Sequence, residues 1–160
     1  MAVVNAYVNT DRAAGKLQDY LPSGGGKIIT VKQSFESAAG DSDGSVYGVF
    51  DMPSNSIPLA GGTVRHDSIT GGTGFTYGLY EYVDGVLVDV DENLFKASTT
   101  HANTTVNDPF ELAMTVGNDG LKLWELLGLT EDPHKTYVWC ITGGTVGDGG
   151  TFNVTAQFLI

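Results

Sequence analysis

Alternating apolar and polar residues recur along most of the chain, and short clusters of glycine and polar residues separate them. In residues 27 to 35, Ile29 and Val31 alternate with Thr30 and Lys32, which is the two-residue period of a strand with unlike faces. The same reasoning predicts strands at 45 to 50, 63 to 69, 75 to 83, 86 to 90, 137 to 141 and 152 to 160. Residues 2 to 8 are also prone to form a strand.

Asp84-Gly85 predicts a tight β-hairpin between residues 75–83 and 86–90, because this dipeptide tolerates the positive φ angles that a two-residue turn needs. Prolines weaken the pattern elsewhere. With Pro53 and Pro58 nearby, a strand at Ile57 to Ala60 is expected to be short or to lie at an edge.

Helical patterns are brief. Residues 121 to 127 place large apolar groups on one helical face, with Asn118 or Asp119 as N-cap and Gly128 as the left-handed residue after the helix. A single helical turn is expected at 91 to 96, and residues 109 to 116 suit a short helix or a strand. The segment from 118 to 160 is expected to organise the fold, with the strands burying Trp124. The predicted structural core is Trp124, Leu127, Tyr137 and Trp139.

About eight strands without strand–helix–strand alternation predict an all-β protein, an antiparallel β-sandwich that is jelly-roll-like and carries one or two short helices. We expect one sandwich domain over residues 27–160, preceded at 1–26 by an N-terminal strand and an irregular arm.

The charge of the chain excludes some partners. Its 160 residues carry a net charge of −11 and have no Lys and Arg cluster, which opposes binding to nucleic acid and to anionic membranes. The single cysteine, Cys140, allows no internal disulfide and favours a reducing compartment. We find no signal peptide and no apolar run of membrane-spanning length, so a soluble protein is expected.

Motifs that resemble catalytic or binding sites lack the context that their chemistry needs. Residues 40 to 44 have the G-x-S-x-G spelling, but two carboxylates flank Ser42 and a strand follows instead of a helix. From Asp41, a calcium loop would need Gly and Glu where Val46 and Met52 stand. Residues 23 to 27 lack two positions of a phosphate loop. His66, His101 and His134 lie far apart, so we expect no catalytic residue, no metal and no cofactor.

Aromatic residues in the predicted strands allow a second interpretation. Trp139, Tyr77, Tyr80 and Tyr82 could stack on sugar rings, although aromatic side chains in strands more often form the core or pair across strands. A glycan-binding role therefore stays open.

The C-terminal third of the chain resembles small virion proteins of tailed bacteriophages. The resemblance rests on Thr115-Val116-Gly117-Asn118, on Leu123-Trp124-Glu125-Leu126-Leu127-Gly128-Leu129, and on Asp132-Pro133 leading through Lys135 and Tyr137 into the last strands. It extends more loosely to residues 27–35, 43–45, 70–73 and 78–80. Within that group, head cement or decoration proteins are similar in size, in β-rich character and in lacking enzymatic motifs.

The resemblance implies a non-enzymatic protein on the capsid surface of the virion, made in the host cytoplasm, that binds the major capsid protein as a homodimer or homotrimer. The residues expected to contact the capsid are Val3, Val4, Tyr7, Arg12 and Lys16. The alternative is a tail or adhesin component that binds a glycan or a host surface.

Overall fold

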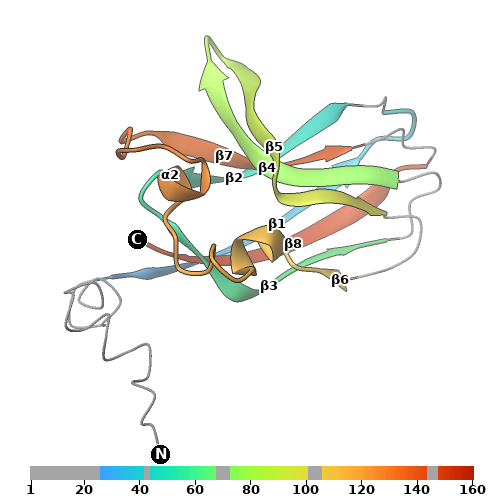
Figure 1. Cartoon of the computed structure of the whole chain (residues 1–160). Coiled ribbons are helices and arrows are strands. Elements are labelled where there is room, and N and C mark those ends of the chain that lie inside the picture. Colours follow the sequence, from blue (N-terminus) through green and yellow to red (C-terminus); the bar gives the residue numbers. More distant parts are fainter. Residues whose placement is uncertain (1–25, 42–43, 68–72, 101–105, 144–147) are drawn as a thin grey trace, which may run out of the picture.

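The computed structural model describes residues 26–41, 44–67, 73–100, 106–143 and 148–160. Within them, eight strands form two four-stranded antiparallel sheets that pack face to face (Figure 1). The strands are β1 (Ile28–Ser37), β2 (Ser45–Pro53), β3 (Ile57–His66), β4 (Thr73–Val83), β5 (Val86–Thr100), β6 (Val106–Asn107), β7 (Thr136–Gly143) and β8 (Gly150–Leu159).

The strand order identifies the topology. The first sheet runs β1-β8-β3-β6 and the second runs β2-β7-β4-β5, so the first four strands alternate between sheets and the last strand returns beside the first. All pairs are antiparallel. This is the eight-stranded jelly roll, a double-sheet form of two Greek keys. The predicted all-β, jelly-roll-like sandwich is confirmed.

The core lies between the sheets. Every second residue of β8 is buried there, and β7 is buried continuously from Tyr137 to Gly143. Trp139 of β7 is fully buried near its centre, with its ring 5.2 Å from Phe50 and 5.3 Å from Tyr77 between centroids. Its indole Nε1 donates a hydrogen bond of 3.3 Å to the carbonyl of Pro109, which satisfies the one polar atom of the ring. The opposite sheet contributes Phe152, Val154, Ala156 and Phe158 of β8.

The expectation that the sheets wrap around Trp124 is wrong. Helix α2 (Leu123–Leu126) buries Leu123 completely, whereas Trp124 is only partly buried and lies outside the core cluster. The N–H groups of Leu123 and Trp124 donate to the carbonyls of Ser56 and Ser54, which fixes the first turn against the β2–β3 connection with Leu123 facing inward. Leu126, three residues on and therefore on the same face, is partly buried against the core, and Trp124 is not.

The ends of α2 match the sequence in part. The helix begins after Lys122 and not after Asn118 or Asp119, and the Lys122 N–H donates to the Glu125 carboxylate at 2.8 Å. Gly128 has a φ of +71° and its N–H donates to the carbonyl of Glu125, so its predicted left-handed role is confirmed.

Two other local predictions differ from the structure. The helical turn expected at 91 to 96 is absent, because β5 continues through these residues to Thr100. The strand expected to be short at Ile57 to Ala60 is the start of the ten-residue β3, with a register shift between Leu59 and Thr63. Among the described residues, β6 pairs only with Val64 and Arg65, so the first half of β3 does lie at an edge.

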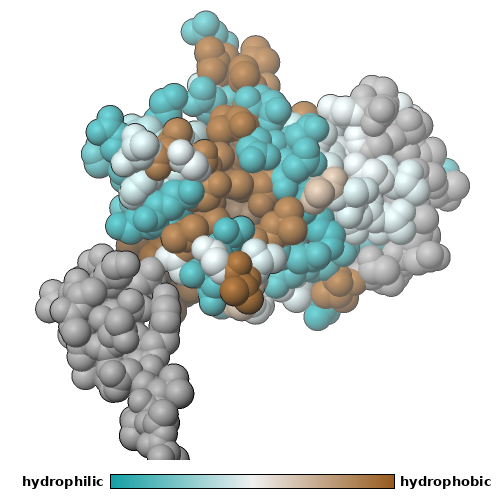
Figure 2. All heavy atoms as spheres, in the orientation of Figure 1, coloured by the Kyte–Doolittle hydropathy of each residue, from teal (hydrophilic) through white to brown (hydrophobic). Residues whose placement is uncertain are grey.

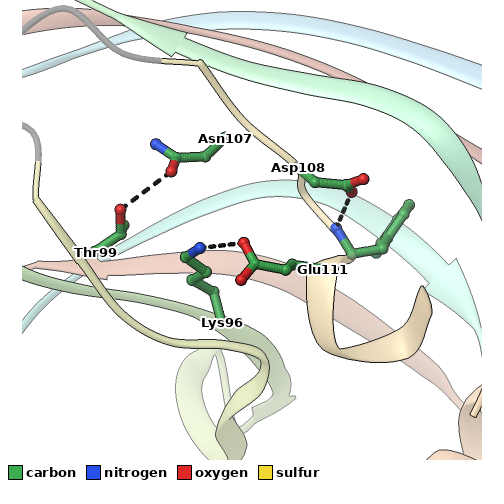
Figure 3. Close-up of polar contacts among 6 residues, drawn as sticks. Lys96, Thr99, Asn107, Asp108 and Glu111 are labelled. Carbon is green, nitrogen blue, oxygen red and sulfur yellow. Dashed lines mark hydrogen bonds and ion pairs between the residues drawn. The ribbon is translucent and has the colours of Figure 1, made fainter. Parts of the chain in front are cut away.

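The distal half of β5 is held by polar contacts to the segment that follows it (Figure 3). Thr99 Oγ1 donates to Asn107 Oδ1 of β6 at 3.2 Å, and Lys96 forms an ion pair with Glu111. Glu111 begins a short 3-10 helix, η3 (Glu111–Met114), one residue after the N–H of Phe110 donates to Asp108 Oδ1 at 2.8 Å. These contacts hold one end of the longest strand in place.

Near its middle, β5 crosses β4 in direct backbone contact. Tyr77 pairs with Lys96 but Leu79 pairs with Asp91, so β5 has three more residues than β4 between these pairs. Between them, a Cβ on Gly78 would lie 2.1 Å from the carbonyl oxygen of Asp91 and 2.5 Å from the Cα of Glu92. Only glycine allows the two backbones to approach this closely.

We therefore expect Gly78→Ala to reduce the free energy of unfolding by about 3 kcal/mol, the upper end of overpacking costs, because the obstacle is backbone that cannot rotate away. Urea titration followed by fluorescence measures the change. Gly48→Ala on the same sheet is the control, since its Cβ would meet side-chain atoms at 3.3 Å and should cost below about 1 kcal/mol. Equal losses in the two variants would contradict the close crossing at Gly78.

Candidate functional site

The end of β4 and the start of β5 extend beyond the second sheet as a two-stranded hairpin, residues 81–89. We call this hairpin the arm; it is distinct from the irregular N-terminal arm expected within residues 1–26. Pairing of β4 with β7 stops at Tyr80, whereas pairing of β4 with β5 continues to the hairpin end. Asp84 and Gly85 form the turn with φ angles of 51° and 81°, as the sequence predicts. In Figure 1 the arm rises above the two sheets.

The arm is apolar on both faces. Tyr82 is 63% exposed, Val83 44%, Val86 63% and Val88 43%. Tyr82 pairs with Leu87, and the neighbouring pair Val83 and Val86 points to the opposite face. Figure 2 shows this apolar surface below a hydrophilic tip. Grouped apolar side chains on a projecting element are typical of a docking surface.

A second apolar cluster holds the base of the arm on the outer face of the second sheet. We call it the outer cluster, and its members are Val46, Tyr80, Leu87, Val138 and Cys140. Gly48 leaves room for this contact, since a Cβ there would lie 3.4 Å from Leu87 Cδ1. Burial raises the pKa of the Cys140 thiol to about 12, so the thiol stays protonated and serves as packing.

Between the arm and β2 lies a groove of about 660 Å³, which we call the acidic groove. Tyr82, Val83 and Val138 contribute its apolar surface. Three carboxylates line it, Asp51, Glu81 and Asp84, and Lys135 pairs with Glu81 at 2.9 Å. The groove thus has an excess of negative charge beside the exposed apolar side chains of the arm, which suits a partner with basic and apolar groups.

A serine, an aspartate and a histidine meet at the β2–β3 turn, but not as a catalytic triad. Buried Ser54 donates its hydroxyl proton to Asp132 Oδ1 at 2.5 Å and accepts a hydrogen bond from the Lys135 N–H. His134 is exposed and lies 3.4 Å from the other Asp132 oxygen. A triad needs the histidine to receive the serine proton, so this arrangement is a structural contact between the turn and the segment before β7.

The structure describes the predicted core residues but not the predicted capsid contacts. Val3, Val4, Tyr7, Arg12 and Lys16 lie outside the described residues, as do Ser42 and His101. Tyr137 and Trp139 are buried in the core, and Leu127 is partly buried against it. His66 is buried with its Nδ1 2.7 Å from the carbonyl of Asp67.

The aromatic residues considered for sugar binding are mostly inaccessible. Trp139 and Tyr77 are fully buried in the core and Tyr80 lies in the outer cluster, which leaves Tyr82 as the exposed member of the set. A groove lined by all four rings, as the sequence allowed, does not form.

Sequence reasoning missed the arm as a surface. Its signal is the run Tyr82-Val83-Asp-Gly-Val86-Leu87-Val88, in which apolar residues stand at consecutive positions on both sides of the turn. Such a run is apolar on both faces, and a hairpin outside the sandwich has no second sheet to cover them.

Among the described residues, no three His, Cys, Asp or Glu side chains come together as metal ligands. The helices within the described ranges are too short or too polar to cross a membrane.

Comparison with known proteins links the fold to two solved structures. No family model matches the chain, and no curated protein matches its sequence. A chain of the cyanophage Pam1 capsid asymmetric unit superposes with a TM-score of 0.56 at 13% identity, over 84% of this chain and 86% of that one. A chain of the capsid of Ralstonia phage GP4 gives 0.54 at 11% identity, over 81% and 83%. At these identities the likeness is one of fold.

The contact of Asp132 makes stability depend on pH. The hydrogen bond from Ser54, followed by that from the His134 N–H, lowers the pKa of Asp132 below its ordinary value of 3.8. The ionised carboxylate therefore stabilises the fold above pH 3.8, and this contribution is lost as the pH falls through the lower folded-state pKa. We expect Asp132→Asn to lower the Tm at pH 7 and to have a smaller effect below pH 3.8.

Thermal unfolding at both pH values measures this difference, and Asp119→Asn, which removes an exposed carboxylate, is the control for net charge. A Tm difference for Asp132→Asn that stays constant with pH would contradict the assignment.

Proposed function

We propose that this protein is a non-enzymatic phage capsid cement or decoration protein, which binds the major capsid lattice and stabilises the head. The observation that carries the proposal is the arm, whose apolar side chains project from a jelly roll like those in two phage capsid structures. A protein that binds the assembled lattice better than free subunits shifts assembly toward the intact shell by mass action. No chemistry is required of it.

In this proposal the arm supplies apolar contact area, and the acidic groove supplies complementarity to basic groups of the lattice. Burial of exposed valines is favourable by about 1.5–3 kcal/mol for each side chain fully covered. The acidic groove has more carboxylates than cations, and this excess negative charge orients a basic partner. Added salt screens the attraction, so the affinity should fall as the salt concentration rises.

The N-terminal segment is a second proposed contact. Val3, Val4 and Tyr7 would pair with an exposed strand edge of the major capsid protein, and Arg12 and Lys16 would contact its polar surface. We further propose that the protein assembles as a homodimer or homotrimer on the capsid surface of the virion after synthesis in the host cytoplasm.

The alternative function is a tail or adhesin component that binds a glycan or a host surface. It is favoured by exposed Tyr82, which lies in the acidic groove beside carboxylates that can accept hydrogen bonds from sugar hydroxyls. Glycan-array binding that is lost in Tyr82→Ala would support it over a role on the capsid.

The arm is tested with the double variant Val83→Asp and Val86→Asp. We expect its affinity for particles that lack the protein to fall by roughly a hundredfold, because two apolar contacts are replaced by charges in a docked surface. Pelleting of particles with bound protein, quantified by mass spectrometry, measures the occupancy. Both side chains are exposed, so the Tm should fall only slightly, through repulsion between the two paired carboxylates.

Val116→Asp is the matched control, since this valine is fully exposed in the turn after η3 and away from the arm. It should leave occupancy unchanged. Full occupancy by the arm variant, or equal loss in the control, would reject the arm as the contact.

The N-terminal contact is tested by deletion of residues 1 to 20. The shortened chain should keep the Tm of the sandwich and lose particle occupancy at least tenfold, since main-chain pairing and the apolar side chains of residues 2 to 8 are removed together. Undiminished occupancy would reject a role for this segment.

A further inference from the structure

A small polar pocket lies on the outer face of the second sheet, beyond the outer cluster. Its volume is about 290 Å³, and it is lined by Gly44, Gly74, Thr76, Glu92, Thr142 and Gly143. Three of these residues are glycines, so among the described residues the side chains that line it are those of Thr76, Thr142 and Glu92. The crossing of β5 over Gly78 places Glu92 over this face, next to residues of β4 and β7.

The hydrogen bonds of the residues that line the pocket leave some of their acceptors unused. The hydroxyls of Tyr80 and Thr142 lie 2.7 Å apart, and the Tyr80 hydroxyl donates to Glu92 Oε2 at 3.5 Å. Burial raises the pKa of Tyr80, so its hydroxyl keeps the proton that it donates. Either hydroxyl of the Tyr80–Thr142 pair can be the donor, and in both arrangements Thr142 keeps a free acceptor lone pair.

Thr76 adds an unused hydroxyl. Its Oγ1 is buried, and within the part of the chain that the structure describes it has no hydrogen-bond partner. A buried hydroxyl without a partner costs free energy, and a ligand that binds to it removes this cost.

The charge of Glu92 is also uncompensated. The three ion pairs found among the described residues join Lys96 to Glu111, His134 to Asp132 and Lys135 to Glu81, so none includes Glu92. The nearest cation along β5 is Lys96, and its ammonium is already occupied. The partly buried carboxylate of Glu92 lies beside the hydroxyls of Thr76 and Thr142. This combination favours binding of a cation that has several hydrogen-bond donors.

We propose that this pocket binds the guanidinium group of an arginine side chain from a partner protein. A guanidinium has five N–H donors and no acceptor, so it complements a pocket whose free groups are a carboxylate and two hydroxyl oxygens. Its planar shape suits a site in which Gly44, Gly74 and Gly143 contribute no side chains to the lining. The inference rests on the proposed function only for the identity of the partner that supplies the arginine.

The pocket is tested with the purified full-length chain and N-acetyl-arginine amide, by following backbone amide shifts in NMR. Saturable shifts at Gly74, Thr76 and Thr142 are expected. Glu92→Gln, which keeps an acceptor for Tyr80, should weaken binding at least tenfold, and the near-isosteric Thr76→Val about fivefold. Glu36→Gln, an exposed carboxylate on β1 of the other sheet, should change nothing.

N-acetyl-lysine amide should bind at least fivefold more weakly, because an ammonium has fewer donors and is a point charge. Equal binding of the two amides, equal loss in Glu92→Gln and Glu36→Gln, or the absence of saturable shifts would each overturn the proposal. The Tm of each variant verifies that it is folded. Particle occupancy is measured separately. Loss of binding to N-acetyl-arginine amide with unchanged occupancy bears on the pocket alone, and loss of occupancy with unchanged binding of the amide bears on the proposed function alone.

Discussion

The close contact of the β4 and β5 backbones at Gly78 is the constraint on which the outer face of the second sheet depends. Because no side chain separates them, β5 can cross β4 and carry three additional residues before its pairing resumes. The crossing places Glu92 over the outer face of the second sheet. It also directs the first half of β5 into the arm, where Leu87 packs on the outer cluster. The distal half is held independently by Lys96, Thr99 and their partners.

As a result, the second sheet carries polar and apolar groups on its outer face in a fixed order. The polar pocket lies at one end, the outer cluster in the middle and the arm with its acidic groove at the other. Tyr80 joins the first two, since its ring packs in the cluster and its hydroxyl bonds to Thr142 and Glu92. A face that combines apolar area with uncompensated carboxylates suits specific association with a basic partner. This is the physical basis of the proposed role on the capsid.

The jelly roll constrains the identity of individual residues less than the arm does. Two phage capsid chains share the fold at 13% and 11% identity, because alternating burial and closely spaced turns are satisfied by many residue combinations. Function therefore depends on the surfaces built on this scaffold. Here the distinguishing surfaces are the arm, apolar on both faces, and the pocket with its unpartnered Thr76 hydroxyl.

The sequence by itself determined most of the strands, the antiparallel sandwich and the Asp84-Gly85 hairpin, because these follow from local alternation and from the φ angles of two residues. It did not determine the continuation of β5 through residues 91 to 96. The tertiary structure alone decided that Trp124, unlike the other predicted core tryptophan Trp139, lies outside the core, since the contact of α2 with Ser54 and Ser56 turns Leu123 inward. It also decided that the consecutive apolar residues of the arm stay exposed. Thr76, Glu92 and Thr142 form a pocket only because the crossing at Gly78 brings three strands together, and no local pattern encodes a contact between such distant residues.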